Sequence, residues 1–237
     1  MTNKQQLSTI LSGLSTKIAS FSVMAASVAS LTACSSSMTP HYYTLTPKVT
    51  PIPSSNVRVI EVLPVNLPDR LNRAPLVLST EQGQSKILDN ERWTSPLAAE
   101  LRDGLSSGLQ QKLGAVDRYN SGMTGGKVAY RIATDFSRFD IVQSSYSNTH
   151  QVEVVVSWIV KRISPMQSES SSVNQSLGLN HQLSCRMSFN EPIKGLDQVS
   201  NAVEASRQSL NRIVNTIANS VIAAESGTIN VQGAVCS

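Results

Sequence analysis

The sequence is poor in the residue types that most often support catalysis or metal binding. Its 237 residues include three cysteines and three histidines. His41, His150 and His181 stand far apart, with no second ligand at metal spacing. No nucleophile with a neighbouring base is recognisable from the spacing of serine, cysteine, histidine and acidic residues. We therefore do not expect an enzyme, a metal site or a cofactor.

The chain also has no large excess of charge of one sign, because basic and acidic residues nearly balance over most of its length. Lys4 and Lys17 lie in an N-terminal segment without acids, and beyond it 18 basic residues face 16 acidic ones. No run of lysines and arginines alternates with aromatic residues, which make up only 5% of the composition. Nucleic-acid binding is therefore not expected.

The N-terminal segment has the composition of an export signal. The lysines accompany an apolar run of small residues from Ile18 to Leu31, which is too short and too rich in serine and alanine for a membrane span. The run ends in Leu31-Thr32-Ala33-Cys34. This string resembles the bacterial lipobox, in which the cysteine is lipidated and becomes the first residue of the mature chain.

We therefore predict a lipoprotein signal peptide over residues 1–33 and a lipidated tether over 34–40, with Cys34 as the lipidation site. Acyl chains on Cys34 would hold the protein in a bilayer far more firmly than a single chain does. Ser35, where a retention signal has Asp, predicts transfer to the outer membrane, with the body on its periplasmic face. An ordinary cleaved signal beside an unrelated cysteine is the alternative.

Residues 41–237 are enough for one domain with a substantial core. Short strands are predicted where β-branched and aromatic residues cluster, over 41–45, 57–65, 76–78 and 86–88. The last two form a hairpin across Gln82-Gly83. Apolar residues on both faces of 57–65 indicate a central strand.

A longer strand begins after a predicted turn at Ser121–Gly126. Val128, Tyr130, Ile132 and Phe136 share one face, but Phe139 and Ile141 have the opposite parity. Because a slip of one residue moves every side chain to the other face, we predict a bulge near Ser137 and Arg138.

Two further strands show alternation, and a solvated loop over Ser164–Ser176 separates them. Their predicted inward residues are Val152, Val154, Val156, Trp158 and Val160 in the first strand, and Leu177, Leu179, His181, Leu183, Cys185, Met187 and Phe189 in the second. An exported chain allows a disulfide between Cys185 and Cys236, which would require the C-terminal tail to fold back over the core. A buried free thiol at Cys185 is the alternative. Thr228–Val235 is predicted to form a last edge strand.

Two amphipathic helices are predicted. The first spans Ser95–Leu113, with Thr94 or Ser95 as its cap, Pro96 at its first position and Gly114 as its left-handed stop. Its apolar stripe is Trp93, Leu97, Leu101, Leu105, Leu109 and Leu113, and Gly104 and Gly108 beside it are typical of a helix lying close on a sheet. The second helix spans Leu196–Ala223, and its polar face lacks the lysines and arginines of a lipid-surface helix.

A family resemblance is carried by the lipobox, Tyr42-Tyr43-Thr44-Leu45, the stretch Val57–Leu78, and above all Glu91-Arg92-Trp93-Thr94-Ser95-Pro96-Leu97 through Leu113-Gly114. In these residues the sequence resembles the paraquat-inducible protein C (PqiC) family of ABC-transport auxiliary lipoproteins. The matched motif residues are Leu67, Pro68, Arg73, Arg92, Trp93, Pro96, Leu97 and Gly114. The loop departs from the family pattern at Arg70, Asn72 and Ala74-Pro75.

The resemblance implies an accessory subunit of an MCE-type system that moves lipids between the two membranes and supports envelope integrity. Its partners would be a periplasmic MCE-domain protein, an inner-membrane component and further copies of the chain in a ring. A structural envelope lipoprotein without a transport role is the alternative. For residues 41–237 we predict a two-layer α/β sandwich of the α+β type, with a mostly antiparallel sheet and both helices on one face.

Overall fold

The computed structural model describes residues 38–53, 55–80, 82–119, 128–143, 150–163, 182–195 and 198–237. Within this part of the chain, Pro40–Ser237 forms one compact unit. Its elements in order are β1 (His41–Tyr43), β2 (Val59–Val62), β3 (Pro75–Thr80), β4 (Ser85–Trp93), α2 (Leu97–Leu113), β5 (Val116–Asp117), β6 (Ala129–Gln143), β7 (His150–Ile163), β8 (Gln182–Pro192), α3 (Gln198–Ser226) and β9 (Val235–Cys236). The predicted signal peptide, Cys34, the turn at 121–126 and the loop 164–176 lie outside the described residues.

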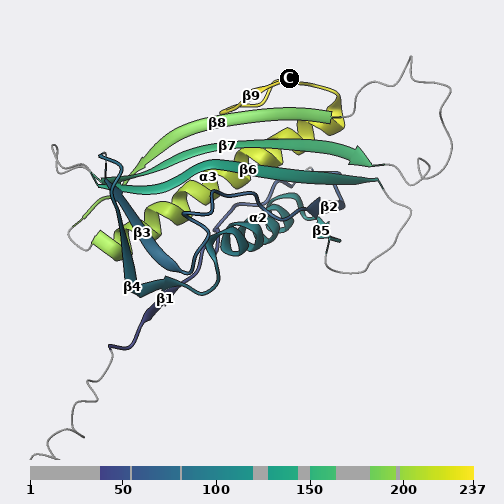
Figure 1. The fold of residues 1–237 in the computed structure, drawn as a ribbon. Coiled ribbons are helices and arrows are strands. Elements are labelled where there is room, and N and C mark those ends of the chain that lie inside the picture. Colours follow the sequence, from purple (N-terminus) through teal and green to yellow (C-terminus); the bar gives the residue numbers. More distant parts are fainter. Residues whose placement is uncertain are drawn as a thin grey trace, which may run out of the picture. The chain divides into compact units, whose positions relative to one another are not determined.

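The described strands form one mixed, open sheet in the order β1-β4-β3-β6-β7-β8-β9, with β2 pairing with β6 and β5 beside this path (Figure 1). The long pairings of β6 with β7 and β7 with β8 are antiparallel, and so is the β3–β4 hairpin. The pairings of β1 with β4, β2 with β5 and β6, and β3 with β6 are parallel. The predicted α+β fold is confirmed, with a larger parallel component than the sequence indicated.

Alternating apolar residues form the inner face of the long strands. The predicted rows of β7 and of the described part of β8 are buried, from Val152 to Val160 and from Leu183 to Phe189. In β6 the register shifts between Phe136 and Arg138, and Phe139 is buried beyond the shift. The predicted bulge is therefore confirmed, and it allows both halves of the strand to contribute to one core.

The shorter strands agree with the predicted hairpin, and β2 has a neighbouring strand on each edge, as a central strand does, although it spans only Val59–Val62 of the predicted 57–65. Leu76 and Leu88 are paired across the hairpin, as are Leu78 and Lys86. β2 lies between β6 and the two-residue strand β5, at the side of the sheet. Pro64 has no N–H for a ladder bond, which explains why β2 ends at Val62.

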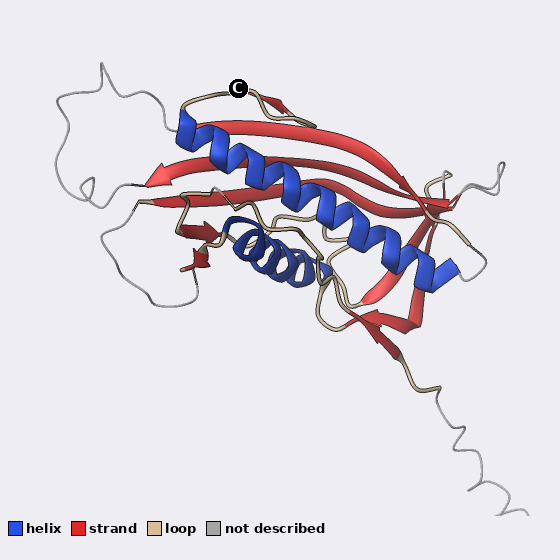
Figure 2. Ribbon diagram, turned by 180° about the vertical axis from the view of Figure 1, so that it is seen from behind, coloured by secondary structure: helices blue, strands red, loops and turns tan. Residues whose placement is uncertain are grey.

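Both helices cover the same face of the sheet (Figure 2). α3 packs on β7 and β8, and α2 packs beside α3. The stripe from Leu97 to Leu113 is buried, as an amphipathic helix on a sheet requires. α2 begins two residues later than predicted and ends at Gly114, whose φ of 64° is left-handed.

The two helical glycines allow a different close approach from the predicted one. A Cβ at Gly104 would lie 2.5 Å from Leu210 Cδ2 of α3 and 2.6 Å from the carbonyl oxygen of Leu45. A Cβ at Gly108 would lie 2.9 Å from both Pro47 and Val214. The prediction that these glycines face the sheet is therefore wrong, since they face α3 and the segment that follows β1.

That segment, residues 44–52, is here called the N-terminal strap. It is held along the two helices at three points. The guanidinium Nε of Arg207 donates to the Thr44 carbonyl at 2.9 Å, the Lys48 amide donates to Asn211 Oδ1 at 2.8 Å, and the Ile52 amide donates to the Lys112 carbonyl at 2.8 Å. Leu45 and Pro47 of the strap are buried.

The C-terminal tail runs back along the sheet edge rather than over the core. β9 is the two-residue strand Val235–Cys236, which is shorter than the predicted edge strand, and it pairs antiparallel with β8. In the structure Cys236 forms a disulfide with Cys185, its Cα partner across the two strands. The amide of Ser237 and that of Ser184 each donate to the other's carbonyl at 2.9 Å.

Candidate functional site

The motif residues singled out from the sequence meet where β1, the loop 66–75, the end of β4 and the start of α2 lie together. We call this region the β1 corner. β1 pairs in parallel with the last residues of β4, with His41 beside Glu91 and Tyr43 beside Trp93. The Glu91 carboxylate accepts a hydrogen bond from the Tyr43 hydroxyl at 2.7 Å and lies 3.0 Å from His41 Nδ1. The first strand of the body is therefore joined to the sheet by side chains as well as by the ladder.

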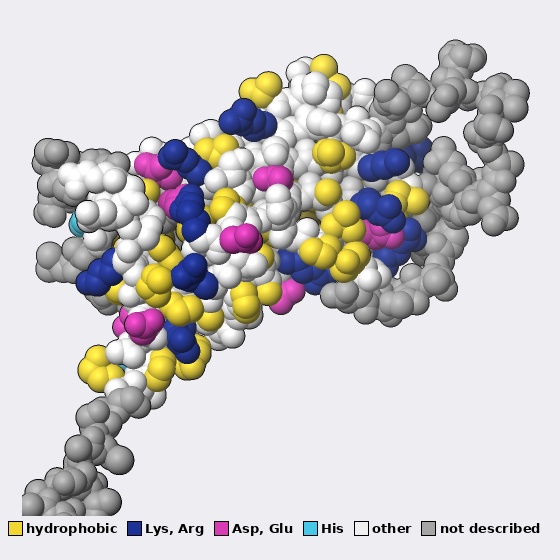
Figure 3. Space-filling view, viewed as in Figure 1, with side chains coloured by type: hydrophobic (Ala, Val, Ile, Leu, Met, Phe, Trp, Pro, Cys, Tyr) yellow, Lys and Arg dark blue, Asp and Glu magenta, His cyan; other side chains and the backbone are white. Residues whose placement is uncertain are grey.

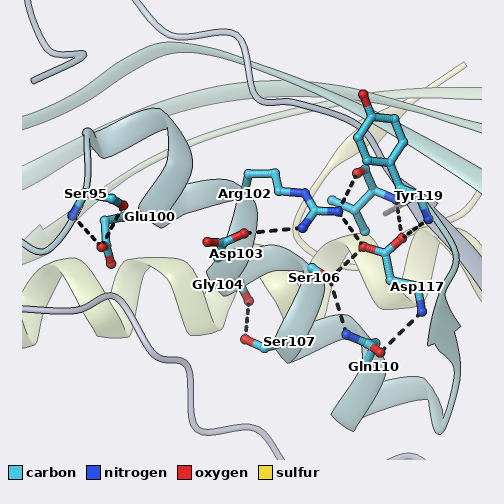
Figure 4. Close-up of polar contacts among 11 residues, drawn as sticks. Ser95, Glu100, Arg102, Asp103, Gly104, Ser106, Ser107, Gln110, Asp117 and Tyr119 are labelled. Carbon is cyan, nitrogen blue, oxygen red and sulfur yellow. Dashed lines mark hydrogen bonds and ion pairs between the residues drawn. The ribbon is translucent and has the colours of Figure 1, made fainter. Parts of the chain in front are cut away.

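Glu100 of α2 connects the strap to the turn before the helix. Its buried carboxylate accepts hydrogen bonds from the Ser95 amide at 3.0 Å and hydroxyl at 2.9 Å (Figure 4). It also accepts from the Thr94 hydroxyl and from the Leu45 amide, the latter at 3.0 Å. Thr94 and Ser95 therefore do not cap the helix as predicted. Pro96 is the N-cap residue and has no side-chain capping bond.

The loop 66–75 satisfies the first amides of α2 instead. The Leu97 amide donates to the Arg73 carbonyl at 3.3 Å, and the Ala98 amide donates to Asn72 Oδ1 at 3.3 Å. The carbonyl of Pro68 accepts from the Leu71 amide at 2.9 Å and from the Asn72 amide at 3.2 Å, which sets the turn. Sequence reasoning missed this cap because it comes from a loop distant along the chain.

The structure places most of the eight motif residues in this corner. Leu67, Trp93 and Leu97 are buried, and Pro68 and Pro96 lie in the turns beside them. Gly114 lies apart, at the other end of α2. Arg73 and Arg92 are half-buried. The Nε–H group of each is buried and has no hydrogen-bond acceptor among the described residues.

A second polar cluster joins α2 to β5 (Figure 4). The Asp117 carboxylate accepts from Arg102 Nη2 at 2.9 Å and from the Ser106 hydroxyl at 2.6 Å. The Arg102 guanidinium also lies 5.5 Å from the centre of the Tyr119 ring. With the Asp117 side chain only 4% exposed, these contacts fix the helix against the strand.

This cluster contains the string Gly104-Leu105-Ser106-Ser107-Gly108, which matches the Gly-x-Ser-x-Gly pattern of α/β-hydrolases. A nucleophile elbow requires a sharp strand-to-helix turn, whereas these residues lie inside α2. Ser106 donates to Asp117 rather than to a histidine. The string is therefore part of the helix packing.

Charged residues also join β2, β5 and β6. Glu61 lies 2.6 Å from Arg118 Nε and 2.7 Å from Arg131 Nε. Burial opposes ionisation of Glu61, but hydrogen bonds from Arg131 and Arg118 outweigh it and lower the pKa of this carboxyl below its usual value. Toward the other end of β6, Arg70 pairs with the buried carboxylate of Asp140.

The sheet face away from the helices carries a shallow groove, here called the outer groove. Its volume is about 670 Å³. The residues that line it from β2 across the sheet to β9 include Leu63, Pro64, Ala133, Asp135, Ile159 and Val235. Ile159 is 40% exposed and Val235 is 82% exposed, so the groove presents apolar surface to solvent.

Among the described residues, no group of three histidine, cysteine, aspartate or glutamate side chains is suited to a metal ion. Neither described helix has an apolar stretch long enough to cross a membrane. His41 contacts Glu91 at the surface, His150 begins β7, and His181 lies outside the described residues.

Solved structures with the same fold support this architecture. A crystal structure of an uncharacterized protein aligns with a TM-score of 0.55 and 20% identity, covering 78% of this chain and 99% of the other. The crystal structure of protein XCC0632 from Xanthomonas campestris aligns with a TM-score of 0.56 and 16% identity, covering 79% and 98%. At these identities the likeness concerns the fold alone.

The family assignment comes from the sequence. No curated protein matches the chain significantly. Residues 43–218 match the family described as ABC-type transport auxiliary lipoprotein component, a span that contains α2, most of α3 and the β1 corner from Tyr43 onward. The chain therefore belongs to the family of ABC-type transport auxiliary lipoprotein components.

Proposed function

We propose that this protein is an outer-membrane lipoprotein, lipidated at Cys34, that serves as a non-catalytic accessory subunit of an MCE-type lipid transport system. The observation that carries the proposal is the family match over residues 43–218, in a chain whose lipobox cysteine stands six residues before Pro40. Ser35 after the cysteine supports the outer membrane rather than the inner one, with the body in the periplasm.

The length of the tether limits where the body works. Residues 35–40 reach about 20 Å when fully extended, at about 3.5 Å per residue. β1 begins directly after this tether, at His41. A lipidated Cys34 would therefore keep the β1 corner within about 20 Å of the bilayer.

The partners we propose are a periplasmic MCE-domain protein with its inner-membrane component, and further copies of this chain in a ring. The resemblance to the PqiC family supports this choice. The outer groove supports it physically, because exposed apolar surface between Leu63 and Val235 is suited to contact with another protein. In this arrangement the lipidated ring fixes the far end of an MCE channel to the outer membrane.

Affinity capture of the lipidated protein from solubilised membranes tests the proposal. We expect an MCE-domain protein in the captured material and loss of membrane retention for Cys34→Ser. Ile159→Arg should weaken capture of the partner, because it places a charge in the outer groove, whereas Ile87→Arg on β4, at 44% exposure, should not. Capture of other envelope proteins without any MCE protein would favour a stand-alone structural role and would refute the transport role.

A further inference from the structure

Arg73 and Arg92 of the β1 corner lack the partners that other arginines of this protein have. Arg70, Arg102 and Arg118 each form an ion pair with a carboxylate that is mostly buried. No such pair involves Arg73 or Arg92 in the described part of the chain. The Nε–H group of each is buried without an acceptor there, but so is that of Arg102, whose terminal nitrogens are paired with carboxylates. Arg73 and Arg92 therefore differ in that no carboxylate of the described residues neutralises these half-buried arginines, and an anion from outside the body would be stabilised at their terminal nitrogens.

The backbone holds the two arginines next to each other. The Trp93 amide donates a hydrogen bond to the Ala74 carbonyl at 2.8 Å. Arg92 directly precedes Trp93 and Arg73 directly precedes Ala74, so this bond brings the two arginines' main chains together. Arg92 is also the Cα partner of Pro75 in β3 and of Tyr42 in β1. The main chains of the two arginines therefore lie close together in the β1 corner.

Tyr42 gives this region an amphipathic side chain. It lies on the edge strand β1, directly opposite Arg92, and is 58% exposed. Figure 3 shows hydrophobic, basic and acidic side chains together over the end of the body where β1, β3 and β4 lie. Tyrosine is enriched at the headgroup level of membranes, where its ring is in an apolar layer and its hydroxyl is hydrated.

The chemistry of the region matches a phospholipid headgroup. Guanidinium groups bind phosphate through paired, charge-assisted hydrogen bonds, and they tolerate partial burial better than ammonium groups do. The region begins one residue after Pro40, and the tether back to Cys34 is about 20 Å at most. If Cys34 is lipidated, the tether holds these arginines close to the phosphates of the surrounding lipid headgroups.

We propose that Arg73, Arg92 and Tyr42 bind phospholipid headgroups of the bilayer in which Cys34 is anchored, so that the β1 corner rests on the membrane surface. This proposal rests on the lipid anchoring proposed above. The acyl chains then keep the protein in the membrane, while the headgroup contacts fix which face of the body is turned toward it. The helices and the outer groove are thereby held in a defined orientation for partners.

Photo-crosslinking of the full lipidated protein in vesicles tests this. The vesicles contain phosphatidylethanolamine with a diazirine on its headgroup, and labelled peptides are located by mass spectrometry. We expect labelling of the tether and of residues 41–43, 71–75 and 90–93. In R73Q/R92Q the crosslinking yield at the three body segments, 41–43, 71–75 and 90–93, should fall about tenfold, which is the factor for the loss of one charge-assisted hydrogen bond. Labelling of the tether should persist.

Matched variants separate charge from structure. R73K/R92K keeps the charge but not the paired guanidinium hydrogen bonds, and should retain more labelling than R73Q/R92Q. The control K161Q/R186Q removes the same charge from exposed positions on β7 and β8 and should match the native protein. Tyr42→Glu, at an exposed position, places a carboxylate opposite Arg92 and should reduce labelling even if R73Q/R92Q fails to fold. Equal labelling of the corner in the native protein and Tyr42→Glu would overturn the proposal.

Two further outcomes show whether the lipid anchor or the assignment to lipid headgroups is wrong. Loss of tether labelling together with loss of vesicle retention would refute the lipid anchor, and with it the basis of this inference. Inorganic phosphate in excess should leave labelling of the corner unchanged, because the anchor holds headgroups at high local concentration. If phosphate abolishes that labelling while the tether remains labelled, the region binds a soluble anion and the assignment to lipid is wrong.

Discussion

Gly104→Ala should destabilise the protein, although alanine is the better helix former. The new Cβ would lie 2.5 Å from Leu210 Cδ2 and 2.6 Å from the carbonyl oxygen of Leu45. The leucine methyl group is able to move, since it ends a flexible side chain. The carbonyl oxygen belongs to the backbone of the N-terminal strap, where the Leu45 amide is bonded to Glu100. Relief of that contact therefore requires the strap to move away from α2.

The magnitude follows from two opposing effects. Replacing glycine by alanine inside a helix gains about 1 kcal/mol. Overpacking against a backbone atom costs about 3 kcal/mol, the upper end of the usual range. The net loss in the free energy of unfolding is about 2 kcal/mol, which lowers the Tm of a domain of this size by about 4–8 °C.

Thermal and urea unfolding of the mature protein, followed by circular dichroism, measure this loss. Gln111→Ala is the control, because Gln111 is exposed on the same helix and should change the free energy of unfolding by less than about 0.5 kcal/mol. A Gly104→Ala protein as stable as the native one would refute the close approach of the strap and α3 to this helix. Equal losses in both variants would refute it as well, since the effect would then not be specific to position 104.

Three further predictions concern covalent and charged contacts. Cys236→Ser should lower the free energy of unfolding by about 2–4 kcal/mol, because the disulfide to Cys185 closes a loop of 51 residues; two free thiols in the native, unreduced protein by mass spectrometry would contradict this. Glu61→Gln should cost about 1–3 kcal/mol at pH 7. Because the pKa of Glu61 is lowered in the fold, the difference in the free energy of unfolding between the native protein and Glu61→Gln, measured by urea titration, should shrink as the pH falls below about 4.3. Burial raises the pKa of Tyr130, so native stability should fall as the pH rises above about 10, and Tyr130→Phe should reduce that fall.

Local patterns were sufficient to predict the long elements. The change of parity between Phe136 and Phe139 predicted the bulge in β6, because both halves of that strand must face one core. The spacing of leucines from Leu97 to Leu113 predicted α2, and Gly114 marked its end. These features depend on residues a few positions apart, which is the range over which periodicity carries information.

Parallel pairings and caps from distant loops were not predictable in this way. β1 pairs with β4 and β3 pairs with β6 only after long connections, and no turn signal marks such partners. The cap on α2 comes from Asn72, which precedes the helix by more than twenty residues. Gly104 and Gly108 indicated a close approach but not which element approaches, since glycine spacing reports only the missing side chains.

The candidate site was predictable only as a set of motif residues, and the structure explains what they have in common. Trp93 and Leu97 were recognisable from the sequence only as part of the apolar stripe of the first helix, and Arg73 followed no pattern. Only the family resemblance grouped the three as motif residues. In the structure their backbone bonds hold β3, β4 and α2 together where β1 joins the body. If the chain is held at Cys34, the pull of the tether reaches the body through β1 and the strap. Strong contacts are required there, and the buried Glu100 carboxylate, with its four hydrogen bonds, supplies them where the strap meets the helix. The motif is therefore better understood as the joint between the anchor and the body than as a reaction centre.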